Sequence, residues 1–146
     1  MRVEHLIEFY AKDRLVNQWV EEILSEKKGA WSIEGAKGSF EALLIAHGFK
    51  SKQENTLLIL EDEDTAGNFA NDLNLFLAEE RAFVLNSSFK RRFDPSYQNK
   101  NSVQEKAEII QNLTIGKKAK IVICHPESLS EKIISSSAFE TFFAAS

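Results

Sequence analysis

The sequence is poor in cysteine, proline and glycine, with one, two and six of them among its 146 residues. The single cysteine, Cys124, excludes an internal disulfide and a zinc site made of cysteines alone. No apolar run approaches the roughly 20 residues that a membrane-spanning helix needs. The N-terminus carries an acid at Glu4 and lacks a long apolar stretch, so no secretory signal peptide is indicated. These absences predict a cytoplasmic domain without membrane contact.

Positive charge is not in excess either, since 18 lysines and arginines face 22 acidic residues and leave a net charge of −4. A domain that gathers nucleic acid through its overall field is usually basic, so we expect little or no DNA binding. The remaining composition, 43% hydrophobic and 27% charged, is that of an ordinary globular domain. A chain of this length most often forms one domain, and it is long enough to bury a core without disulfides.

Two apolar patterns alternate along the chain, one with helical spacing and one of short continuous runs. Residues 1–28 are predicted to form an N-terminal helical segment and residues 29–146 an α/β domain. Strands joined by helices favour a mainly parallel sheet of about four strands with helices on both faces. The 56–60 run does not alternate, so that strand is expected to be covered on both faces.

The predicted elements follow one another in a simple order. They are one or two helices at 3–25, a strand at 31–33, a helix from 39 that stops at Gly48, a strand at 56–60, a helix at 66–77, a strand at 82–85, a loop at 86–102, a helix from 103 closed by Gly116, a strand at 121–124 and a helix whose first turn holds Pro126.

The turn after the first predicted strand has the frame of a nucleotide-binding P-loop, G-x-x-x-x-G-K-[ST]. In that motif the backbone cradles phosphate, the lysine contacts the outer phosphates and the hydroxyl holds Mg²⁺. On this frame Gly35 is the first glycine, Gly38 and Ser39 lie inside the loop, Phe40 replaces the second glycine, Glu41 replaces the lysine and Ala42 replaces the serine or threonine. We therefore expect a degenerate loop without cofactor or metal. The simpler interpretation is that the glycines only turn a strand into a helix.

An acidic run, residues 61–64, follows the strand at 56–60 and raises the alternative of a phospho-receiver domain with Mg²⁺. Such a domain also needs an acceptor aspartate and a lysine after two later strands, where this chain has Asn86 and His125. The acids are equally suited to the positive N-terminus of the helix that follows them. The receiver-like interpretation is therefore the weaker one.

Two further groups of residues could carry chemistry. Cys124 and His125 are adjacent, but neighbours on a strand point to opposite faces, so we interpret them as a core cysteine beside a histidine at the strand end. No catalytic residue is predicted. Lys90, Arg91 and Arg92 form the basic cluster of the loop, and they are possible contacts for phosphate or an acidic partner.

The end of the chain is unusually aromatic, with Phe139, Phe142 and Phe143 at spacings that share one face of a helix. Such a face must be buried, either against this domain or against other parts of a longer protein. We expect the chain to be part of a larger multidomain protein, and the aromatic face to promote self-association when it is uncovered.

The order of the segments resembles the amino-terminal end of bacterial transcription-repair coupling factors, the Mfd family, over roughly residues 30–134. The first module of that family is similar to the damage-recognition protein UvrB and has a degenerate P-loop. The resemblance rests on the following segments, in this order: Ile33–Ser39, Ala42–Ala46, Thr56–Leu60, Asn71–Leu73, Phe76–Leu77, Phe93–Gln98, Glu105–Ile110 and Ile121–Leu129.

The resemblance implies an α/β fold related to P-loop NTPases and a non-catalytic scaffold in the module that recruits UvrA to stalled RNA polymerase. It also implies that ATP and Mg²⁺ serve a translocase motor downstream, and that the partners are UvrA, RNA polymerase and the remaining domains of the same chain. The alternative from another class is a small active P-loop NTPase or phosphate-binding enzyme. Position 41 distinguishes the two, because a glutamate there opposes phosphate binding.

Overall fold

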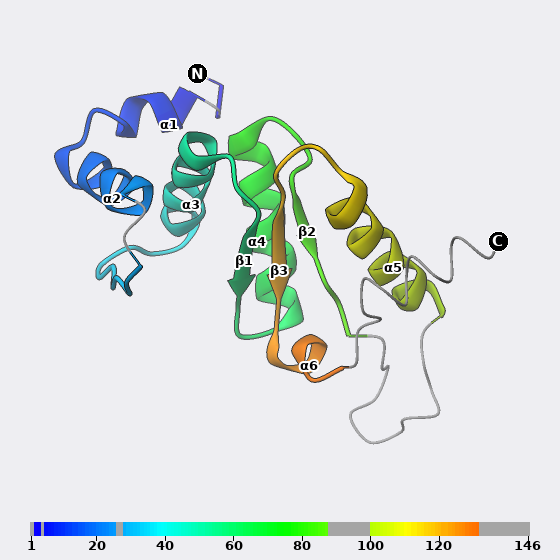
Figure 1. Cartoon of the computed structure of the whole chain (residues 1–146). Helices are drawn as coiled ribbons and strands as arrows, with labels where there is room; N and C mark the ends of the chain where they lie inside the picture. The colour runs from blue at the N-terminus through cyan, green and yellow to red at the C-terminus, as the bar shows by residue number, and fades with distance from the viewer. Residues whose placement is uncertain (1, 4, 26–27, 88–99, 132–146) are drawn as a thin grey trace.

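A computed structural model of the chain describes residues 2–3, 5–25, 28–87 and 100–131, with the backbone only at 100–103 (Figure 1). Its elements, in chain order, are α1 (His5–Tyr10), α2 (Arg14–Leu24), α3 (Ser39–Lys52), β1 (Thr56–Ile59), α4 (Glu63–Leu77), β2 (Ala82–Val84), α5 (Lys100–Ile115), β3 (Ile121–Cys124) and α6 (Pro126–Leu129). Within these residues no helix is long and apolar enough to cross a membrane.

The three strands form one open parallel sheet in the order β1-β3-β2. Ile121 of β3 lies opposite Thr56 of β1 on one side and Ala82 of β2 on the other. Parallel neighbours need crossover connections, which α4 and α5 supply here. The predicted α/β class and the parallel sheet are therefore confirmed.

Helices lie on both faces of the sheet, as the sequence predicted. On the inner face, Ile121 and Ile123 of β3 pack into a core with α1, α3 and α4, in which Leu73 of α4 is fully buried. On the outer face, Val122 and Cys124 form a smaller cluster with side chains of α5. Figure 1 shows α1, α2 and α3 gathered on the β1 side of the sheet and α5 on the β2 side. The inner face therefore carries most of the packing.

The strand β1 differs from the prediction, because only one of its faces is covered. Leu58 and the following Leu60 pack on the inner core, but Leu57 and Ile59 are 59% and 60% exposed. The outer helix α5 packs instead over Val122, Cys124 and Leu85. An unbroken apolar run is typical of a doubly covered strand, and here the outer cover is missing within the described residues.

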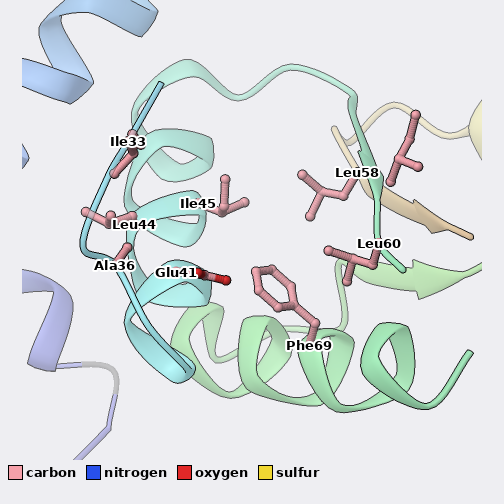
Figure 2. Close-up of a pocket in the computed structure, with 9 residues that line it drawn as sticks. Ile33, Ala36, Glu41, Leu44, Ile45, Leu58, Leu60 and Phe69 are labelled. Carbon is pink, nitrogen blue, oxygen red and sulfur yellow. The ribbon is translucent and has the colours of Figure 1, made fainter. Parts of the chain in front are cut away.

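The predicted strand at 31–33 is wrong: this segment pairs with none of the described strands, and the part of the chain that the structure describes has three strands rather than about four. Trp31 and Ile33 are the apolar residues of this segment, and each remains nearly half exposed, at 48% and 45%. Figure 2 shows α3 between this stretch of chain and β1, so the segment does not run alongside that strand. Local apolar character alone does not make a strand without a partner.

The predicted stop at Gly48 is also wrong, since α3 continues to Lys52 and ends at Gln53 in the left-handed conformation. Gly48 is buried where α3 meets α2, and a Cβ there would lie 3.1 Å from the ring of Trp19. This glycine serves close helix packing rather than termination. By contrast, Gly116 follows the end of α5 and Pro126 begins α6, as predicted.

Candidate functional site

The candidate site is the turn that leads into α3. Gly35 and Gly38 both have positive φ, +85° and +59°, a conformation that glycine adopts without strain. Gly38 is the N-cap of α3 and, having no side chain, leaves the first turn of the helix uncapped by a side chain. A glycine turn therefore leads into a helix at this place. The strand that precedes a P-loop is absent, because residues 31–33 form none.

The residues at the phosphate-binding positions are engaged within the protein. Ser39 donates its hydroxyl hydrogen to Asp72 of α4 at 2.7 Å, which ties the start of α3 to its neighbouring helix. The Phe40 ring packs edge-on against Tyr10 of α1, with centroids 5.3 Å apart. Ala42 is completely buried in the inner core, with no oxygen to offer a metal. These contacts stabilise the packing of three helices and leave the turn without a phosphate ligand set.

Glu41 occupies the position of the P-loop lysine, and its side chain is exposed. Figure 2 shows its carboxylate directed into a hollow of about 220 Å³ beside β1. The other residues that line the hollow carry no charge: they are Ile33, Ala36, Leu44, Ile45, Leu58, Ile59, Leu60 and Phe69. An anion in this place repels phosphate, so the hollow is unsuited to a nucleotide.

The acidic run at 61–64 lies at the carboxyl end of β1, where α/β sheets often bind ligands. Asp62 is the N-cap of α4, and its carboxylate accepts a hydrogen bond from the backbone amide of Thr65 at 2.7 Å. That hydrogen bond lowers the pKa of the Asp62 carboxyl below its usual value. Among the described residues no three histidine, cysteine or acidic side chains gather as metal ligands. The helix-capping interpretation of this run is therefore confirmed for Asp62.

Cys124 and His125 are placed as a core cysteine and a histidine at the strand end. Cys124 is 2% exposed, and burial raises the pKa of its thiol, which the nearby Lys106 ammonium only partly opposes. His125 is fully buried as the N-cap of α6, with its Nδ1 atom 3.2 Å from Glu127 Oε2. A buried thiol with a raised pKa is a poor nucleophile. The side chain of Asn86, the other receiver position, lies just beyond β2.

Several predicted residues lie outside the part of the chain that the structure describes. They are the basic cluster Lys90, Arg91 and Arg92 and the aromatic residues Phe139, Phe142 and Phe143. Their predicted roles stay predictions.

Sequence reasoning missed three sets of polar contacts that hold the site and the sheet. Ser39 and its hydrogen-bond partner Asp72 are 33 positions apart in the sequence. Lys106 of α5 forms a largely buried ion pair with Glu131, which is 25 positions away. The spacing of apolar residues indicates which residues share a face of one helix or strand, so it does not predict contacts between residues on separate elements. Asn74 of α4 is a third case, since its side chain accepts hydrogen bonds from the amides of Arg81 and Ala82 at 2.8 Å and fixes the start of β2.

Comparison with family models, with curated proteins and with solved structures gave no match.

Proposed function

We propose that this chain is the N-terminal, UvrB-like part of a transcription-repair coupling factor and acts there as a non-catalytic scaffold. The observation that carries the proposal is that the residues of the degenerate P-loop contact other helices of the domain. Its residues pack α3 onto α1 and α4, through Phe40 and Ser39, and its lysine position holds the carboxylate of Glu41. A loop that has exchanged phosphate ligands for packing contacts suits a domain that retains the P-loop architecture without the catalysis.

The resembling segments also support the proposal through their places in the fold. Thr56–Leu60 and Ile121–Leu129 contain the neighbouring parallel strands β1 and β3. The segments at 71–73 and 76–77 lie on α4, and Glu105–Ile110 lies on α5. These elements build the sheet and its two crossovers. The segments on which the resemblance rests are therefore structural ones, as a scaffold requires.

In this proposal the chain binds no nucleotide itself. ATP and Mg²⁺ belong to the translocase motor of the whole protein, and UvrA and RNA polymerase are partners of the whole protein. The P-loop NTPase-like ancestry of the sheet is part of the same proposal. The contribution of this domain is rigid support, because its inner core fixes α3 and α4 against the sheet.

The coding sequence beyond the codon of Ser146 tests the proposal most simply. We expect an ATP-dependent translocase motor downstream in the same reading frame. A stop codon directly after Ser146 would contradict the proposal, because the scaffold would then have nothing to support.

We predict weak or no binding of this chain to duplex DNA. Because the net charge is −4, the chain can make few phosphate contacts, and binding would therefore release few counterions. Fluorescence anisotropy with a labelled duplex at physiological salt measures this directly. Submicromolar affinity would refute the prediction, and neutralising Lys90, Arg91 and Arg92 together would then show whether the basic cluster is responsible.

A further inference from the structure

The strand β1 lies at the edge of the sheet, and no described strand pairs with its outer edge. Leu60, just after β1, donates its amide hydrogen to the carbonyl of Cys124 on β3 at 2.9 Å. Successive residues of a strand alternate in direction, so the amide and carbonyl groups of Leu57 and Ile59 point away from β3. An edge with unpaired groups is a template for another strand.

The space beside this edge has an apolar lining that suits the side chains of an added strand. The 220 Å³ hollow lies between β1, α3 and the turn that holds Ile33 and Ala36 (Figure 2). Ile45 of α3 and Phe69 of α4 contribute apolar side chains to it, and Glu41 contributes its single charge. A strand paired with β1 would direct every second side chain into this hollow.

We propose that the free edge of β1 and this hollow form a docking site for an extended segment of a partner polypeptide. The segment pairs with Leu57 and Ile59, buries alternate apolar side chains against Ile45 and Phe69, and places a lysine or arginine beside Glu41. Backbone pairing of this kind supplies affinity, and the alternate side chains supply specificity. The charge of Glu41 selects the basic residue.

The lining also distinguishes this partner from a second copy of the chain. The residues from Thr56 to Leu60 include no basic side chain that could meet Glu41. In addition, α3 flanks the hollow beside β1, so the α3 helices of two copies paired through β1 would compete for the same space. A separate basic, apolar segment fits the site better than β1 itself.

This proposal deepens the scaffold function and rests on it, because it assigns Glu41 to protein binding in place of phosphate binding. The two remain separable by experiment. Peptide binding at β1 tests the docking site, and nucleotide binding at the turn before α3 tests the degenerate loop. Failure of the first leaves the second result unchanged.

The test uses the whole chain and a short blocked peptide in which valine alternates with threonine and the central valine is replaced by lysine. Two-dimensional NMR should show saturable shifts and slowed amide exchange at Leu57 and Ile59. A peptide methylated on the amides that face β1 should not bind. The Glu41→Lys variant should bind the lysine peptide on the order of five-fold more weakly and prefer a glutamate peptide.

The matched control is Glu63→Lys, the same charge reversal in the first turn of α4 and outside the lining of the hollow. It should leave the affinity for both peptides unchanged. Equal binding of the lysine and glutamate peptides to the natural chain, or no binding at millimolar peptide, would overturn the proposal. So would protection of the Leu57 and Ile59 amides without peptide: protection at high dilution would mean that the chain covers its own edge, and protection that rises with protein concentration would indicate a second copy.

Discussion

Replacing Ile123 by alanine is expected to lower the free energy of unfolding by about 2–5 kcal/mol. Ile123 lies in the middle strand β3, has no exposed surface and packs in the inner core with α3 and α4. Truncating this side chain removes buried apolar surface and leaves a cavity. The cavity stays open because other contacts hold the surrounding helices in place. Urea denaturation followed by circular dichroism measures the loss as a lower transition midpoint.

Ile59→Ala is the matched control, the same substitution on the neighbouring strand β1. Ile59 is 60% exposed on the outer face, so its truncation should cost no more than about 1 kcal/mol. Similar losses for Ile59→Ala and Ile123→Ala would contradict the account of β1, because the outer face of this strand would then be covered.

Replacing Lys106 by alanine is expected to destabilise the protein by about 3–5 kcal/mol. Lys106 and Glu131 form an ion pair whose side chains are only 12% and 6% exposed, and Ser87 also donates a hydrogen bond to Glu131. Without Lys106 the buried Glu131 carboxylate loses its ion pair with this ammonium group. Thermal or urea unfolding of the variant measures the effect.

Two controls separate burial from charge in this prediction. Lys118→Ala removes the cation of an exposed pair with Glu79, whose side chains are 74% and 55% exposed, and should cost about 0–1 kcal/mol. The double variant Lys106→Met/Glu131→Leu removes both charges and should recover most of the stability that Lys106→Ala loses. A loss of less than about 1 kcal/mol for Lys106→Ala, as expected for an exposed pair, would contradict the prediction.

The sequence predicts the parallel sheet well because β1, β2 and β3 are marked by local apolar runs between helical patterns. The helix α4 and the start of α6 at Pro126 are likewise encoded by nearby residues. The predictions fail where the local structure depends on contacts with residues that are distant in the sequence. Gly48 signals a helix end locally, but its role is set by Trp19 of another helix. The segment at 31–33 has the character of a strand, but α3 separates it from β1.

The candidate site was predictable only in part for the same reason. That Phe40, Glu41 and Ala42 do not fit the P-loop motif is visible in the sequence, because the motif is a local pattern. The contacts that the residues of the site make are not visible there, because the packing of Phe40 on Tyr10 and the hydrogen bond from Ser39 to Asp72 join separate elements. The direction of the Glu41 side chain into the hollow beside β1 likewise depends on how the helices pack.

The central proposal is that the turn before α3 does not bind nucleotide, and calorimetric titration with Mg-ATP at millimolar ligand tests it most directly. We expect no saturable heat, because Glu41 replaces the phosphate cation and Ala42 replaces the metal oxygen. The variant Glu41→Lys/Ala42→Thr should also fail to bind tightly, since Phe40 still crowds the loop against Tyr10. A saturable one-site heat with the natural chain would contradict the account.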